Sequence, residues 1–146
     1  MKRFFLMCLL INLINLPLAC GQSKTATTLD TQHYNTTDEI AIDGYDVVAY
    51  FTENKAVKGK DAYSQTYDGV SFHFASQKNA ELFEQNPEKY VPQYGGWCAY
   101  AVGEYGSKVE IDPDTFKIKD GKLYLFYNRL FTNTLKLWNK DEARLY

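Results

Sequence analysis

Three side chains in this sequence could bind a metal ion or attack an electrophile: Cys98, His73 and Asp46. Cys98 follows two glycines, at the start of a helix expected over residues 97–102. The free N–H groups and the dipole of a helix's first turn stabilise a thiolate. Thiolate and neutral imidazole suit copper and zinc, and a carboxylate can add a further ligand. The three residues therefore predict a soft or borderline metal site.

Each of these residues also has a structural interpretation. Cys98 could be a buried small hydrophobe, because free cysteine is among the most buried residue types. His73 could face solvent or make a local hydrogen bond, and Asp46 could accept backbone N–H groups in a turn. A thiol-dependent redox protein or enzyme is a third hypothesis for Cys98. The sequence has no C-x-x-C motif and no glycine-rich phosphate loop, so we expect a non-catalytic protein.

The N-terminus has the features of an export signal. Two basic residues precede an apolar run over residues 4–16, which is shorter than the roughly 20 residues that span a bilayer. The run ends at Leu16-Pro17-Leu18-Ala19-Cys20, which resembles a lipobox. We expect residues 1–19 to be removed and Cys20 to carry a lipid. Cleavage by an ordinary signal peptidase, which would leave a free thiol, is the alternative.

Composition and charge limit the partners. Without residues 1–19 the chain has 14 basic and 18 acidic residues, a net charge of −4, which argues against nucleic acid as a partner. Residues 20–39 are polar and lack an apolar period, so they predict a flexible tether. Residues 40–146 predict one domain, held at a bacterial membrane and facing the periplasm or the cell surface.

The positioning elements follow from local patterns. Asp68-Gly69 and Asp120-Gly121 each separate two β-type runs, which predicts two hairpins with two-residue turns. Ser76 is a candidate N-cap for a helix. The remaining expected elements are a strand over 47–51, a helical turn over 87–90 and a helix over 133–144. The sequence predicts an α+β fold, in which short helices pack on a small antiparallel sheet built from hairpins.

Tyrosine is abundant, and its large apolar body with a polar tip suits the wall of a binding pocket. A ligand pocket is therefore a second candidate site, and core packing is the alternative for the same side chains. The tyrosines assigned to this pocket are Tyr45, Tyr50, Tyr94, Tyr100 and Tyr127.

One stretch resembles a known family. YDGVSFHFASQKNAELFEQNPEKY, at 67–90, is similar to the YHS domain, in which an aromatic hairpin leads into a helix and a Pro-x-x-Tyr turn. Three more stretches resemble a secreted, lipoprotein branch of that family. They are DGYDVVAYF at 43–51, YGGWCAYA at 94–101 and DPDTFKIKDGKLYLFYN at 112–128.

The resemblance implies a module that handles metal ions. Related domains carry cysteines in a Phe-Cys-Ser-x-x-Cys run and one more cysteine upstream. In this sequence Ala75 and Asn79 occupy the two positions of the run, and the region around Asp46 has no cysteine. The resemblance therefore leaves Cys98 as the candidate metal-binding thiol. A binding domain for a small ligand or a protein, with Cys98 structural, is the alternative.

Overall fold

The computed structural model describes residues 33–146 and confirms the predicted α+β class. The predicted signal segment, Cys20 and most of the expected tether lie outside the described residues. In chain order the elements are β1 (Thr36–Thr37), β2 (Ile40–Ala41), η2 (Ile42–Gly44), α1 (Val47–Thr52), β3 (Lys60–Tyr67), β4 (Val70–Phe74), α2 (Gln77–Gln85), α3 (Pro87–Tyr90), η3 (Gln93–Gly96), α4 (Ala99–Tyr105), β5 (Asp112–Lys119), β6 (Lys122–Phe126), β7 (Asn128–Arg129), β8 (Thr132–Asn133), α5 (Thr134–Trp138) and α6 (Glu142–Leu145).

Both predicted hairpins are present. β3 pairs antiparallel with β4 across Asp68-Gly69, and β5 pairs antiparallel with β6 across Asp120-Gly121. All four turn residues have positive φ, between 51° and 78°, as a two-residue hairpin turn requires. The first hairpin belongs to a four-stranded sheet of order β1-β2-β4-β3, in which β2 and β4 are parallel and the other pairs antiparallel.

The strand predicted over residues 47–51 is wrong, because these residues form helix α1. A short apolar run does not distinguish a buried strand from a buried helix by its periodicity. The local cap decides in favour of the helix: Asp46 Oδ1 accepts hydrogen bonds from the backbone N–H of Val48 and Ala49, at 2.8 and 3.2 Å. Val47 to Tyr50 are all buried, so the run is a helix with little exposed surface.

The other helices agree with the sequence in place but not in every boundary. Ser76 caps α2 through a bond from Asn79 N, as predicted. The helix expected over 97–102 begins two residues later, as α4. The helix expected over 133–144 is divided into α5 and α6. No helix among residues 33–146 is both long and apolar enough to span a membrane.

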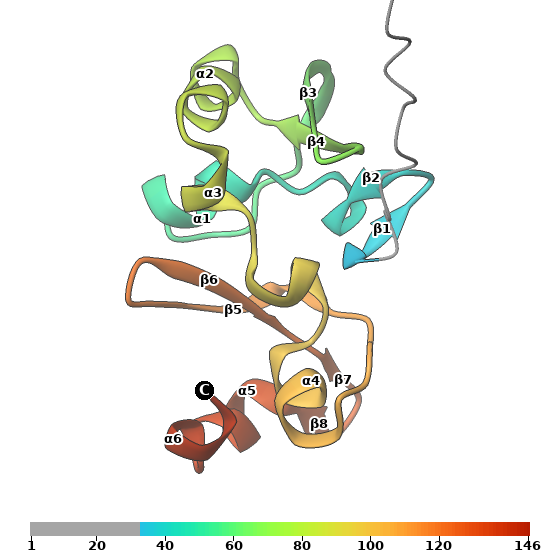
Figure 1. Ribbon diagram of the computed structural model, residues 1–146, viewed down its shortest axis with the longest axis vertical. Helices are drawn as coiled ribbons and strands as arrows, with labels where there is room; N and C mark the ends of the chain where they lie inside the picture. The colour runs from blue at the N-terminus through green and yellow to red at the C-terminus, as the bar shows by residue number, and fades with distance from the viewer. Residues whose placement is uncertain (1–32) are drawn as a thin grey trace, which may run out of the picture.

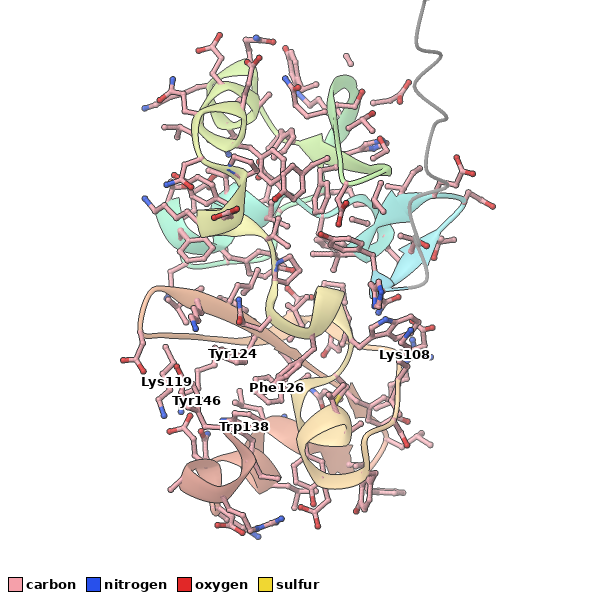
Figure 2. The ribbon with its side chains drawn as sticks, in the orientation of Figure 1. Lys108, Lys119, Tyr124, Phe126, Trp138 and Tyr146 are labelled. Carbon is pink, nitrogen blue, oxygen red and sulfur yellow. The ribbon has the colours of Figure 1, made fainter. Side chains whose placement is uncertain are left out.

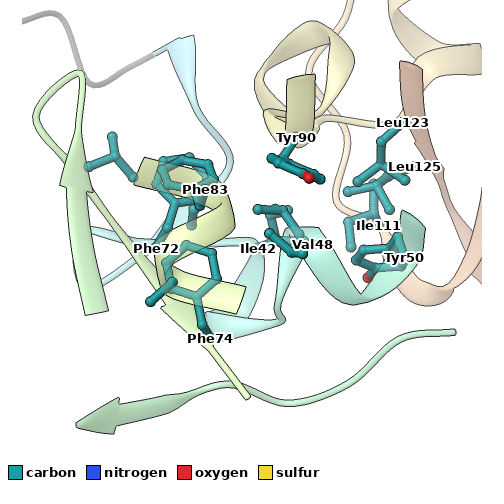
Figure 3. Packing of buried hydrophobic residues seen from close by; sticks show 14 of the residues in the cluster. Ile42, Val48, Tyr50, Phe72, Phe74, Phe83, Tyr90, Ile111, Leu123 and Leu125 are labelled. Carbon is teal, nitrogen blue, oxygen red and sulfur yellow. The ribbon is translucent and has the colours of Figure 1, made fainter. Parts of the chain in front are cut away.

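The main core joins the two halves of the molecule. Figure 3 shows Phe72, Phe74 and Phe83 stacked between β4 and α2, while Leu123 and Leu125 approach α1 from β6. Strand β6 is buried on both faces, since its alternate residues Tyr124 and Phe126 belong to a second cluster. In that cluster they pack with Trp138 of α5 (Figure 2). β6 therefore lies between the part that contains α1–α3 and the part that contains α4–α6 (Figure 1).

Candidate functional site

Cys98 is completely buried, at 0% exposure, directly before α4. Its side chain makes no cap hydrogen bond to that helix. The sulfur lies 3.3 Å from Thr134 Oγ1 and accepts a hydrogen bond from Tyr127 N at 3.4 Å. Thr134 donates its hydroxyl hydrogen to the Tyr127 carbonyl at 2.9 Å, so the thiol is the donor to Thr134. The thiol thus connects the start of α4 with the residue after β6 and with the start of α5, inside the core.

His73 lies on β4 with a different set of neighbours. Its side chain is 12% exposed, and its Nε2 is 3.8 Å from a carboxylate oxygen of Asp61. Gly44 lies against the ring, where an added Cβ would sit 3.5 Å from Nδ1. At Gly59 an added Cβ would approach the His73 backbone carbonyl carbon to 2.5 Å. The histidine is therefore packed between two close backbone segments.

Asp46 is buried at 0% exposure and both of its carboxylate oxygens are engaged. While Oδ1 caps α1, Oδ2 accepts hydrogen bonds from Ala75 N at 2.8 Å and Asn79 Nδ2 at 2.7 Å. Ala75 and Asn79 are the two positions where related domains carry cysteines. A carboxylate–amide network therefore occupies the place that the resemblance assigns to a soft-metal cage.

These environments do not bring the predicted metal ligands together. Within residues 33–146, no three His, Cys, Asp or Glu side chains form a group that could hold a metal ion. Cys98 forms hydrogen bonds with Thr134 and Tyr127. The Asp46 carboxylate accepts hydrogen bonds from four N–H donors. This donor set does not fit a bound copper or zinc ion.

The five tyrosines assigned to one pocket are dispersed. Tyr45 and Tyr94 line two different cavities. Tyr50 is a core residue that donates to the Pro113 carbonyl at 3.0 Å, and its burial, followed by the charge of Asp114, raises the pKa of its hydroxyl. Tyr100 packs edge-on against Tyr105, and Tyr127 packs on the main core. No single aromatic pocket forms from this set.

The cavity at Tyr45 gathers polar groups that the sequence did not single out. It has a volume of about 380 Å³, and Thr37, Asp38, Asp43 and Lys58 line it together with Tyr45. Thr37 donates to Asp43 Oδ1 at 2.6 Å. Lys58 donates to the Asp43 carbonyl, and its Nζ lies 4.6 Å from the centre of the Tyr45 ring. Among residues 33–146 the Asp38 carboxylate has no hydrogen bond or ion pair.

The backbone that forms this cavity is strained. Asp38 and Asp43 have φ of 51° and 49°. Ile42 also has a φ of 49°, where a β-branched residue is a genuine outlier. The conformation of Ile42 costs about 1–3 kcal/mol, whereas aspartate tolerates positive φ in turns; outliers of the Ile42 kind cluster at binding and active sites. An Asp-Gly dipeptide such as Asp43-Gly44 is typical of turns, but nothing in the sequence indicates that Ile42 shares this left-handed conformation.

A second left-handed turn is connected to the first. Tyr94, Gly95 and Gly96 all have positive φ, from 55° to 87°. Buried Asn35 links the two turns: its carbonyl accepts from Ile42 N at 3.0 Å, while its own N–H donates to the Gly95 carbonyl at 2.8 Å. Its side-chain amide also donates to the Gly96 carbonyl, at 3.3 Å. Asn35 thus fixes the position of both turns.

Residues 48–94 match the family model of the YHS domain. The match covers α1 to α3 and the hairpin of β3 and β4, and it ends before Cys98. No curated protein and no solved structure matches the chain.

Proposed function

We propose that the protein, whose residues 48–94 match the family model of the YHS domain, is a non-catalytic binding module with its ligand site in the Asp43 cavity. The observation that carries the proposal is the convergence of a carboxylate, an ammonium group and an aromatic ring on a strained backbone turn. A turn that required only structure would not need an isoleucine at positive φ. The free-energy cost of the Ile42 conformation is explained if the turn positions Asp43 for a ligand.

The groups in the cavity indicate the class of ligand. Asp38 and the second oxygen of Asp43 are acceptors that have no donor among the described residues. Lys58 supplies one donor group and a cation over the Tyr45 ring. These groups are complementary to a small molecule whose amine faces the carboxylates and whose hydroxyl faces Lys58. A hydroxyl-bearing amine is therefore the proposed ligand class.

In this proposal Cys98 is structural and not a metal ligand. The support is its complete burial and its two hydrogen bonds, which leave the sulfur no open side. The same environment argues against the redox hypothesis, because a reactive thiol must be reached by its oxidant or substrate. Metal handling through Cys98 then requires the core to open.

The proposal also includes export and anchoring. We expect the chain to leave the cytoplasm, lose residues 1–19 and remain attached to a bacterial membrane through a lipid on Cys20. Wild-type protein should enter the detergent phase on phase partition, and Cys20→Ser should either release the protein into the aqueous phase or leave the precursor uncleaved. A wild-type protein that is wholly aqueous, with an unmodified N-terminus, would rule out the anchor.

A thermal-unfolding panel tests the ligand site. Ethanolamine and glycerol serve as donor probes, and acetate as the anionic control. Ethanolamine should raise the melting temperature, since a ligand at a hundred times its Kd adds about 2.7 kcal/mol of stability. Asp43→Asn and Asp38→Asn should each reduce the shift.

The matched control is Asp114→Asn, which alters an exposed carboxylate that does not line the cavity. It should keep the full ethanolamine shift. Equal shifts of the melting temperature in the wild type and all three variants would show that ethanolamine does not bind in the cavity. The absence of a shift in the wild type would show the same. Stabilisation by copper(I) or zinc that Cys98→Ala abolishes would favour the metal-binding alternative.

A further inference from the structure

Two large apolar side chains project from the tip of the β7–β8 hairpin. Leu130 is 96% exposed and Phe131 is 103% exposed. The next most exposed large hydrophobic residue, Tyr105, is 68% exposed and packs on Tyr100. Single exposed apolar residues are common on proteins, but adjacent, fully exposed leucine and phenylalanine indicate a contact surface.

The turn itself differs in its residues from the turns of the two longer hairpins. Both longer hairpins use Asp-Gly at their two central positions, whereas this one uses Leu130-Phe131. Leu130 has a φ of 54°, in the left-handed region that favours glycine. The tip of the β7–β8 hairpin therefore combines a strained backbone conformation with two exposed apolar side chains. Sequences break local rules of this kind mainly at functional sites.

Basic side chains border the tip. Arg129 precedes the tip on β7. Lys136 lies on α5, and Lys140 lies just after that helix. A cavity of about 320 Å³ lies beside Phe131 and is lined in part by both lysines. Among residues 33–146, none of these three cations forms an ion pair.

The acidic groups of the neighbouring C-terminal segment are occupied elsewhere. Glu104 and Asp141 both pair with Arg144. Glu142 pairs with Lys117 and Lys119. None of these three acidic residues therefore pairs with Arg129, Lys136 or Lys140, although the whole chain has a net negative charge.

We propose that this hairpin tip docks on an anionic phospholipid surface. Leu130 and Phe131 enter the acyl boundary, while Lys136 and Lys140 receive headgroup phosphates in the adjacent cavity. Apolar insertion combined with basic contacts is the arrangement of interfacial membrane binding. The contact goes beyond both the ligand cavity and the lipid on Cys20, and it would hold the domain against the membrane in a fixed orientation.

The test measures binding of the chain from residue 20 onward, carrying Cys20→Ser, so that neither the apolar run over residues 4–16 nor a lipid on residue 20 contributes. The probes are vesicles of phosphatidylcholine alone and of phosphatidylcholine mixed with phosphatidylglycerol. The protein should bind only the anionic vesicles. The double variant Leu130→Gly/Phe131→Ser restores ordinary turn chemistry, so it should fold and lose the binding. Lys136→Glu/Lys140→Glu should weaken the binding roughly tenfold or more.

The matched control is Lys78→Glu/Lys122→Glu, which changes the net charge equally. Lys78 lies on α2, at the end of the molecule opposite to β7 and β8 (Figure 1). This control should retain most of the binding. Absence of vesicle binding by the parent protein overturns the proposal, as does equal binding by the tip variant. Self-association of the parent that the tip variant abolishes, without vesicle binding, would instead assign the tip to a contact between copies.

Discussion

The carboxylate of Asp46 joins segments that are distant in the sequence. One oxygen caps α1, and the other accepts from Ala75 and from Asn79 at the start of α2. Since the side chain is fully buried, its desolvation is compensated by these four hydrogen bonds and not by water. Asp46 therefore fixes α1 against α2 and the end of β4.

Asp46→Ala should lower the free energy of unfolding by about 3–5 kcal/mol, because it removes a helix cap and leaves buried donors without an acceptor. Urea denaturation followed by circular dichroism measures the loss. Asp114→Ala, at an exposed position, is the control and should change stability by less than about 0.5 kcal/mol. A loss below about 1 kcal/mol for Asp46→Ala would show that the network contributes little.

The sequence could predict local roles at this scale but not distant partners. The cap at Ser76 was readable because its partner, Asn79, lies three residues away. The partners of Asp46 directly after β4 and on α2 lie 29 and 33 residues away. Spacing along the chain carries no information on such contacts. For the same reason, the sequence could not predict that the Cys98 thiol forms hydrogen bonds with Thr134 and Tyr127.

Among the secondary-structure elements, the two longer hairpins are the parts of the fold that the sequence predicts best. Asp120 and Gly121 have φ of 51° and 72°, and no atom lies within 4 Å of a Cβ added to Gly121. A substitution there changes backbone strain without steric contact. The same two-residue signal made both hairpins predictable, whereas α1 was mistaken for a strand because its run is apolar on every side.

Gly121→Val should destabilise the protein by about 1–2 kcal/mol, since a β-branched residue is strained at positive φ. The comparison is Asp120→Asn, which keeps a residue type that tolerates this conformation and should be nearly neutral. Thermal unfolding of the two variants beside the wild type measures the difference. Equal melting temperatures for Gly121→Val and the wild type would contradict the turn assignment.

At the scale of the whole molecule, Glu142 attaches the C-terminal helices to the β5–β6 hairpin. Lys117 donates to its carboxylate at 2.7 Å, and Trp138 Nε1 donates at 2.8 Å. Lys119 reaches the second oxygen at 3.1 Å. These hydrogen bonds, with that from Lys117 the largest cause, lower the pKa of Glu142 from 4.5 to about 2.

A carboxyl group whose pKa is lowered by folding stabilises the protein above its unfolded pKa, and this contribution is lost as the pH falls through the folded value. Glu142→Gln should therefore be less stable than the wild type at neutral pH, by about 0.5–1 kcal/mol because solvent screens the pair. The difference should shrink between pH 4.5 and about 2. A difference that stays constant over this range would mean that ionisation of Glu142 is not involved.

The arrangement of the Asp43 cavity could not be predicted from the sequence. It depends on Asn35, which holds the turn at Ile42 and the turn at Gly95 through bonds that span 7 and 60 residues. The Asp43-Gly44 and Gly95-Gly96 dipeptides are of types that are common in turns. That the two turns share one connecting residue, and that Lys58 reaches Asp43, are properties of the assembled chain.

The central claim is that function resides in the Asp43 cavity and that Cys98 is structural. Titration of isotope-labelled protein with ethanolamine, followed by two-dimensional amide NMR, tests it most directly. Saturable shifts are expected at residues 37–45 and at Lys58, with the signals of Cys98, Tyr127 and Thr134 unchanged. Shifts centred on those three residues, or no saturable shift at residues 37–45 and Lys58, would contradict it.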